Sequence, residues 1–258
     1  MNIRSFSLAE LSSTEIGRVA ASAVLVLPVG AVEQHGAGLP TGTDALVSAE
    51  IARRAAASLT GVPVLVAPVL SYGSSHHHLP LPGTLSLRSR TLLAVLGDLI
   101  ESAAATGFRR IVLFNGHGGN DDLIRQAARD AVLDLPIAVG ATSYWSLGGD
   151  RLAELAREAG ITHVPGHAGA FEAALTLALG CTLPAVPSSV PAEPPHEPAY
   201  GFALEHGWIA RMGGVTDPIG PATRETGERL LDHLVAAFTA YLEAFARDFR
   251  RQATGQNR

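Results

Sequence analysis

The feature of this sequence that most constrains its fold is an alternation of short β-branched runs with longer segments of helical period. Apolar runs that predict strands occupy residues 23–29, 63–69, 110–115 and 136–141. Alanine- and leucine-rich segments that predict helices occupy residues 45–58, 89–106, 121–133, 150–158, 170–179 and 222–250. Strands that alternate with helices in this order are typical of a parallel sheet covered by helices. We therefore expect an α/β fold.

The length of 258 residues suits one large α/β domain or two small ones. Prolines are concentrated in residues 182–200, which interrupts the helical pattern. A linker between two domains has this composition, but the sequence after it is too short for a second domain. We expect a single domain over residues 1–258, with a long surface loop at the proline-rich segment.

Composition and charge exclude several classes of partner. Hydrophobic residues make up 47% of the chain, which indicates a buried core rather than disorder. The chain has 19 Lys and Arg against 24 Asp and Glu, so its charge does not favour nucleic acid or an anionic membrane. Its apolar runs fall short of the roughly 18 residues of a membrane span, and the start lacks a signal-peptide pattern. We expect a cytoplasmic protein with a small-molecule ligand.

Cysteine and the glycine-rich segments limit the kinds of site the chain can build. Cys181 is the single cysteine, which excludes an internal disulfide and cysteine-cluster metal sites. Any metal must therefore be bound by histidine and carboxylate side chains. Polar, glycine-rich segments follow the predicted strands, where open parallel sheets place their ligand sites. These segments are residues 30–44, 71–84, 115–120 and 166–172.

Glu33 and His35 are two residues apart, so in an extended segment both side chains leave the same face of the chain. The following loop can return Asp44 towards them. Two carboxylates and an imidazole without a thiolate suit Zn²⁺, Mn²⁺ or Fe²⁺. The alternative interpretation is that Glu33 and His35 are a solvated pair on a loop.

His117 follows an apolar strand and lies between Gly116 and the pair Gly118 and Gly119, which allow close approach of a backbone or a ligand. This placement favours a functional histidine over an ordinary core residue. The alternative is a loop that binds phosphate at a helix N-terminus. However, neither a complete GxGxxG motif nor a P-loop lysine is present.

Taken together and in order, these motifs resemble the creatininase (creatinine amidohydrolase) family. The matching segments are residues 33–36, 39–40, 43–44, 72–78, 82–84, 115–120 and 167–172, with a weaker match at 213–225. The resemblance implies a three-layer α/β/α sandwich with a mostly parallel sheet. It also implies a metal-dependent hydrolase of non-peptide or unusual amide C–N bonds, and a homo-oligomer, commonly a hexamer.

The resemblance also implies roles for individual residues. It places Glu33, Asp44 and His117 on one metal, with His35 and the shared Asp44 on a second. Zn²⁺ is the first expectation, with Mn²⁺ or Fe²⁺ as alternatives, at one or two ions per subunit. Such a metal lowers the pKa of a bound water towards 7 and so provides a hydroxide nucleophile.

The remaining site residues are assigned to catalysis or to substrate binding. His167 is expected to be the general acid for the departing nitrogen. Glu172 is expected to be catalytic, a metal ligand, or both. The residues expected to contact the substrate are His78, Gly118, Gly119 and Trp145. Trp145 at a strand end is equally typical of core packing, and we expect His76 and His77 to be loop surface.

Two departures from the family pattern leave alternatives open. Creatininases have a glutamate where this sequence has Gly119, which points away from creatinine and towards the glycine-rich members of the family. Those members include deformylases and a peptidase that trims a modified peptide precursor. The usual Glu-Thr-Ser is replaced by Glu172 followed by two alanines. A protein that binds metal without turnover is therefore a further alternative.

Overall fold

A computed structural model describes residues 5–184 and 205–249 of the chain. At its centre is a four-stranded sheet in the order β2-β1-β3-β4, and each pair of neighbouring strands is parallel. The strands are β1 (Val24–Val29), β2 (Val64–Val66), β3 (Arg110–Asn115) and β4 (Ala138–Ser143). The parallel sheet expected from the sequence is confirmed.

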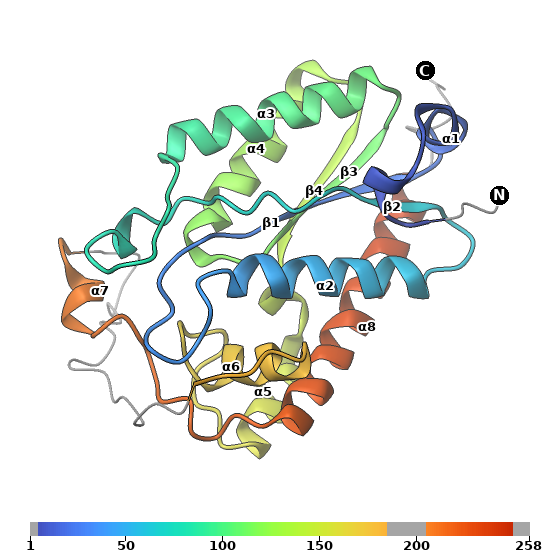
Figure 1. The fold of residues 1–258 in the computed structure, drawn as a ribbon. Coiled ribbons are helices and arrows are strands. Elements are labelled where there is room, and N and C mark those ends of the chain that lie inside the picture. The colour runs from blue at the N-terminus through green and yellow to red at the C-terminus, as the bar shows by residue number, and fades with distance from the viewer. Residues whose placement is uncertain (1–4, 185–204, 250–258) are drawn as a thin grey trace.

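Helices cover both faces of this sheet (Figure 1). One layer contains α2 (Thr43–Ser58), α5 (Gly149–Glu158), α6 (Ala170–Ala178) and α8 (Arg224–Asp248). The other layer contains α1 (Ser13–Val19), α3 (Ser89–Ala105) and α4 (Asp121–Asp134). The described residues therefore form the expected three-layer α/β/α sandwich.

The central strand β1 shows why the sequence folds in this way. Successive side chains of a strand point to opposite faces of the sheet. Val24 and Val26 pack into the core shared with α2 and α8, whereas Leu25 and Leu27 pack into the core on the side of α3 and α4. All residues of β1 are buried. A strand covered on both faces must be apolar throughout, which produces a continuous apolar run in the sequence.

Several expected boundaries are shifted in the structure. The strand expected over residues 63–69 is regular only over β2 (Val64–Val66), and β4 lies two residues later than the segment 136–141. The helix expected over 45–58 already begins at Thr43, so Asp44 lies in the first turn of α2. The last helix, α8, begins after Thr223, whose side chain accepts a hydrogen bond from the Thr226 main-chain nitrogen, and it ends at Asp248.

Two short helices were not expected from the sequence. Helix α1 has seven residues, too few to show an apolar period, although Ser12 and Glu15 form a capping box at its start. Helix α7 (Trp208–Arg211) is a single turn. Residues 185–200 of the expected proline-rich loop lie outside the described residues. Within the described ranges, no helix is both long and apolar enough to cross a membrane.

The start of α2 packs closely against the strand ends. A Cβ atom at Gly116 would overlap the main-chain oxygen of Asp44, and one at Gly30 would overlap the backbone of Ala45. Only glycine at these positions allows helix α2 to approach β1 and β3 so closely. This contact places the side chain of Asp44 at the carboxyl ends of the two central strands, the edge where open α/β sheets place their sites.

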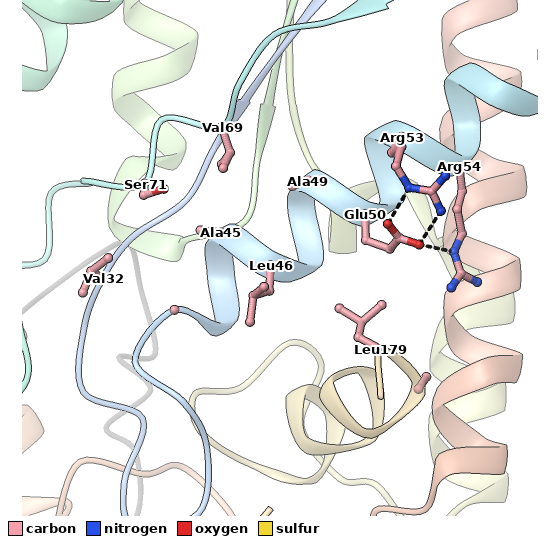
Figure 2. Close-up of a pocket in the computed structure, with 12 residues that line it drawn as sticks. Val32, Ala45, Leu46, Ala49, Glu50, Arg53, Arg54, Val69, Ser71 and Leu179 are labelled. Carbon is pink, nitrogen blue, oxygen red and sulfur yellow. Dashed lines mark hydrogen bonds and ion pairs between the residues drawn. The ribbon is translucent and has the colours of Figure 1, made fainter. Parts of the chain in front are cut away.

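A shallow cavity of about 720 Å³ lies along the solvent side of α2 (Figure 2). Its lining is mostly apolar and includes Val32, Leu46 and Leu179. At one end, Glu50 pairs with Arg53 and Arg54. None of the site residues predicted from the sequence lines this cavity.

Candidate metal centre

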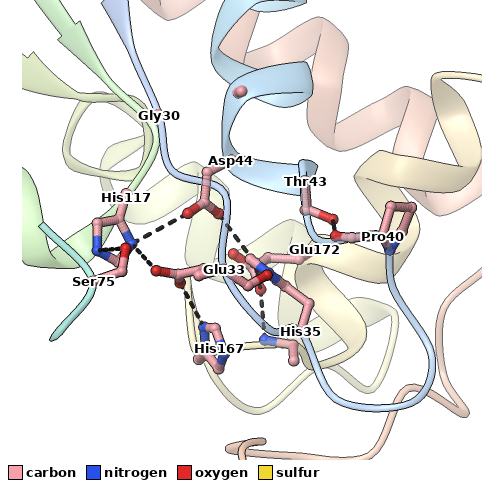
Figure 3. A network of polar contacts seen from close by, with 12 residues as sticks. Gly30, Glu33, His35, Pro40, Thr43, Asp44, Ser75, His117, His167 and Glu172 are labelled. Atoms are coloured by element: carbon pink, nitrogen blue, oxygen red, sulfur yellow. Dashed lines mark hydrogen bonds and ion pairs between the residues drawn. The ribbon is translucent and has the colours of Figure 1, made fainter. Parts of the chain in front are cut away.

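Acidic and imidazole side chains converge at the carboxyl ends of β1 and β3 (Figure 3). Glu33 and His35 come from the loop after β1, Asp44 from the first turn of α2, and His117 from the loop after β3. His167 precedes α6, and Glu172 lies in the first turn of that helix. The structure thus brings together every residue expected from the sequence to bind metal or to be catalytic. We call this group the carboxylate–histidine cluster; its members are Glu33, His35, Asp44, His117, His167 and Glu172.

Asp44 lies between two imidazoles. Its Oδ1 atom is 3.1 Å from Nε2 of His35, and its Oδ2 atom is 3.2 Å from Nδ1 of His117. The two oxygens of one carboxylate therefore face different halves of the cluster. A carboxylate in this position has one oxygen free to reach each of two cations; the bridging role expected for Asp44 stays a prediction.

The first half of the cluster is centred on His117. Nδ1 of His117 is 3.1 Å from Oε2 of Glu33, in addition to its contact with Asp44. On the other side of the ring, Nε2 is 3.2 Å from the main-chain oxygen of Ser74. A carbonyl oxygen only accepts hydrogen bonds, so Nε2 carries a hydrogen, and Nδ1 is the ring nitrogen left to face the carboxylates.

The second half is centred on His35 and follows the same logic. Nδ1 of His35 is 3.1 Å from the main-chain oxygen of Glu33, so Nδ1 carries a hydrogen and Nε2 faces the interior of the cluster. This Nε2 atom is 3.1 Å from Oδ1 of Asp44 and 3.7 Å from Oε2 of Glu172. The carboxylate of Glu172 also accepts a hydrogen bond of 2.6 Å from the main-chain nitrogen of Ala168. Glu172 thus closes the second half of the cluster.

The donor set of the cluster fits a divalent cation. Both carboxylate oxygens of Glu33 and Oδ2 of Asp44 are buried and face imidazole nitrogens at 3.1 to 3.5 Å. Buried carboxylates of this kind are costly in a protein interior unless they are paired or bind a metal. The ligand atoms of Glu33, His35 and Asp44 lie within 4.8 Å of one another, and so do those of His35, His167 and Glu172. Oxygen and imidazole ligands without thiolate suit zinc, manganese or iron.

The protonation behaviour of the cluster supports the same interpretation. Burial opposes protonation of His117, but the carboxylates of Glu33 and Asp44 outweigh it and raise the pKa to about 10. Burial likewise opposes protonation of His35, and Asp44 and Glu172 raise its pKa well above the ordinary value. Burial raises the pKa of Glu172. The cluster therefore attracts positive charge, and a metal that binds there must displace protons.

His167 lies at the solvent-facing edge of the cluster. Its side chain is 15% exposed, compared with 6% or less for its neighbours in the cluster. Nδ1 of His167 is 3.5 Å from Oε1 of Glu33. Burial, together with the neighbouring His35, lowers the pKa of His167 well below its ordinary value. Thr216 holds its backbone: the main-chain nitrogen of His167 donates to Oγ1 of Thr216, and the nitrogen of Thr216 donates to the carbonyl of His167.

The residues expected to contact a substrate lie in different surroundings. His78 is buried, with Nε2 3.3 Å from Oε1 of Glu33. Gly118 and Gly119 form the tight turn after His117, and a Cβ atom at Gly119 would overlap the main-chain oxygen of Ser74. Trp145 packs against the hydrophobic core and meets the Tyr144 ring edge-on, with ring centroids 4.9 Å apart.

Sequence reasoning missed part of the surroundings of His117. His77 was expected at the loop surface, but it is half-buried and stacks on His117 with ring centroids 5.7 Å apart. Trp208 of α7 stacks on His77 at 6.0 Å. His76 is exposed, as expected. The run of histidines forms a 3-10 turn, η2 (His76–His78), which turns successive side chains in different directions. Three identical adjacent residues gave no sequence signal for this difference.

The fold and the cluster define an α/β protein with a buried carboxylate–histidine centre of the kind that binds metal. The chain belongs to the creatininase (creatinine amidohydrolase) family, whose model matches residues 9–242. It is 36% identical over 176 residues to a creatinine amidohydrolase of Pseudomonas putida, an alignment that covers 63% of this chain and 66% of that protein.

Two further relatives add to this comparison. The chain is 36% identical over 134 residues to a mycofactocin precursor peptide peptidase of Mycobacterium tuberculosis strain CDC 1551, covering 46% of this chain and 53% of that protein. The chain thus matches between about half and about two thirds of the length of these curated relatives. Its structure matches that of a mutant creatininase of Zn-Zn type with a TM-score of 0.81 and 31% identity, over 94% of this chain and 99% of that one.

Proposed function

We propose that this protein is a metal-dependent amidohydrolase that cleaves a non-peptide or unusual amide C–N bond of a small molecule. The observation that carries the proposal is the position of Asp44, whose two oxygens face the ring nitrogens of two different imidazoles. In this proposal Glu33, Asp44 and His117 hold one ion, and His35, Asp44 and Glu172 hold a second. Zinc is the first candidate, with manganese or iron as alternatives.

The metal, when bound, supplies a Lewis acid that polarises the scissile carbonyl and acidifies water. The chain's own contribution is proton transfer at His167. Because its pKa is lowered, His167 is neutral at pH 7 and can take a proton from the attacking water at Nδ1, the ring atom that faces Glu33. It then returns that proton to the departing nitrogen, since amines leave poorly unless they are protonated. In this scheme, Glu172 holds His35 and the second ion in position.

Gly119 bears on the choice of substrate. The turn at Gly119 has no room for a side chain, so the chain does not place a glutamate next to His117 as the family resemblance would require for creatinine. This observation favours a member of the family with another substrate, and a peptidase that trims a modified peptide precursor is the second candidate. The similarity to a mycofactocin precursor peptide peptidase supports keeping it.

A hydrolysis screen tests the proposal. Metal-free protein is assayed with creatinine, formamides, lactams and short peptides, before and after addition of Zn²⁺, Mn²⁺ or Fe²⁺. We expect hydrolysis of at least one amide class that depends on added metal and is lost in His117→Ala. Hydrolysis that is independent of metal, or that persists in His117→Ala, would overturn the proposal. Metal bound at full occupancy with no hydrolysis of any class would favour the third alternative, metal binding without turnover.

We also propose a cytoplasmic homo-oligomer, in keeping with the hexamer that the family resemblance implies. Light scattering at micromolar concentration is expected to give a mass several times the 26.8 kDa of the chain. A monomer at this concentration would contradict it.

A further inference from the structure

Gln34 lies between the cluster residues Glu33 and His35, and its side chain is buried and points to four different segments. Its Oε1 atom accepts a hydrogen bond of 2.9 Å from the main-chain nitrogen of Gly36. A main-chain N–H can only donate, so this contact fixes which end of the amide is oxygen. The amide nitrogen, Nε2, therefore faces the histidines.

The amide nitrogen has more neighbours than hydrogens. Nε2 of Gln34 is 2.9 Å from Nδ1 of His78, 2.9 Å from Nε2 of His167 and 3.0 Å from the main-chain oxygen of Gly214. An amide carries two hydrogens. The carbonyl of Gly214 can only accept, so it takes one of them. A single hydrogen remains for the two imidazoles.

The main-chain oxygen of Gln34 determines which imidazole receives the remaining amide hydrogen. This oxygen is 3.1 Å from Nε2 of His167 and can only accept, so Nε2 of His167 carries its own hydrogen and donates it there. The remaining amide hydrogen then goes to Nδ1 of His78. The opposite assignment would place a bare Nε2 of His167 against a carbonyl oxygen, and an N–H of His78 against an amide nitrogen that does not accept.

This assignment gives the two histidines opposite characters. A neutral His78 that accepts at Nδ1 carries its hydrogen on Nε2, which is 3.3 Å from Oε1 of Glu33. A neutral His167 with its hydrogen on Nε2 has a bare Nδ1, which is 3.5 Å from the same oxygen. His78 thereby directs an N–H at Glu33, and His167 presents a proton acceptor.

We propose that Gln34 is a positioning residue that sets these proton positions, so that His78 directs an N–H at Glu33 and His167 accepts a proton. The role of His167 in proton transfer rests on the proposed function, but the proton positions themselves do not depend on it. This assignment also opposes a third metal. The ligand atoms of Glu33, His78 and His167 are close enough to hold a cation, but a cation there would have to displace the hydrogen from Nε2 of His78.

Neutron diffraction from crystals of the zinc-loaded protein, exchanged into D₂O, tests the proton positions without any assay of activity. We expect deuterium on Nε2 of His78 and on Nε2 of His167, with the Gln34 amide deuterium atoms directed at Nδ1 of His78 and the oxygen of Gly214. Deuterium on Nδ1 of His78, or a cation bound between Glu33, His78 and His167, would overturn the proposal. Neither result would bear on whether the protein is a hydrolase.

Gln34→Met tests the consequence, because methionine has a similar length but cannot form these hydrogen bonds. Once a substrate is known, we expect kcat to fall about 10- to 100-fold, the usual effect of losing a partner of a site residue. We expect KM and zinc content to change less than twofold. The matched control is Gln126→Met on α4, whose amide reaches only the exposed Asp130 among the contacts of the structure. If Gln34→Met keeps the kcat of this control, the positioning role is wrong.

Discussion

Helix α2 carries two acidic side chains whose surroundings are opposite. Asp44, in the first turn, is 2% exposed and faces the imidazoles of His35 and His117, and its Oδ2 atom has no hydrogen-bond partner. Glu50, further along the helix, is 24% exposed, and its oxygens lie 2.7 Å from the guanidinium nitrogens of Arg53 and Arg54. Figures 2 and 3 show the two regions from close by.

The contrast supports placing the proposed chemistry in the buried region. The charges around Glu50 are paired and partly solvated, and such surface pairs contribute little to stability. The carboxylates around Asp44 are buried and face imidazoles, with no Lys or Arg among their contacts in the described residues, and burying charge in this way is costly for folding. The cavity beside Glu50 is the more open region, but the proposed site lies in the buried one. Buried carboxylates that face imidazoles are therefore the better guide to the proposed site.

Removing Asp44 is expected to have the largest effect. Asp44→Ala takes away a carboxylate that both halves of the cluster share, and a site short of one anionic ligand holds a dication poorly. We expect bound metal and hydrolysis to be lost together. Metal analysis and activity assays check this, with Glu50→Ala on the same helix as the control that retains both. Metal content that is unchanged in Asp44→Ala would contradict the bridging role.

Replacing His167 is expected to separate proton transfer from metal binding. His167→Ala removes a proton-transfer group, which typically costs about 10² to 10⁴ in rate. The bound metal should remain, because the carboxylates and the other histidines of the cluster are unchanged. The measurement is kcat together with metal content. If His167→Ala empties the site as completely as Asp44→Ala does, His167 is a metal ligand and its assignment to proton transfer is wrong.

Adjacent glycines beside His117 offer a smaller and more local test. A Cβ atom at Gly119 would overlap Ser74 and the ring of His117, whereas one at Gly118 would meet nothing within 4 Å. Gly119→Ala is therefore expected to cost about 1 to 3 kcal/mol of stability and to weaken metal binding. Gly118→Ala should stay within about 0.5 kcal/mol. Thermal unfolding compares them, and equal stability of the two variants would show that the turn is not as tight as described.

The smallest effect is expected at Glu50. Its hydrogen bonds with Arg53 and Arg54 lower its pKa from the ordinary 4.5 to about 2, even though burial opposes this. The stabilisation is complete above pH 4.5 and is lost as the pH falls through about 2. Glu50→Gln should cost less than about 1 kcal/mol at neutral pH and leave hydrolysis unchanged. Denaturant unfolding at pH 7 and at pH 2 measures the difference in unfolding free energy between the wild type and Glu50→Gln. We expect this difference to shrink at pH 2, and a larger difference there would contradict the prediction.

Much of the fold follows from the sequence because its signals are local. The continuous apolar run of β1 and the period of α3 each identify their element without reference to the rest of the chain. The short helix α1 was missed because only its cap at Ser12 and Glu15 marks it. The end of β2 was misplaced because an edge strand is defined by pairing, and its regular pairing with β1 stops at Val66.

The residues of the candidate site also fall into those that a local motif predicts and those that it does not. Glu33, His35, Asp44 and His117 could be named because each lies in a recognisable motif after a strand or at a helix start. The roles of Gln34 and His77 could not. They depend on contacts with His167, Gly214 and Trp208, which are distant in sequence. His167 and Gly214 meet Gln34 in the loop after β1, and Trp208 of α7 meets His77 of η2, only in the folded chain. No local pattern encodes those contacts.

In the proposed function, Asp44 joins two metal positions in the buried cluster. Crystals of protein purified without chelator and supplied with Zn²⁺, measured on both sides of the zinc absorption edge, give the sharpest test. We expect two anomalous peaks, one between Glu33, Asp44 and His117 and the other between His35, Asp44 and Glu172. A single peak would limit the protein to one metal and contradict the bridge. The absence of any peak at these residues would contradict the metal centre itself.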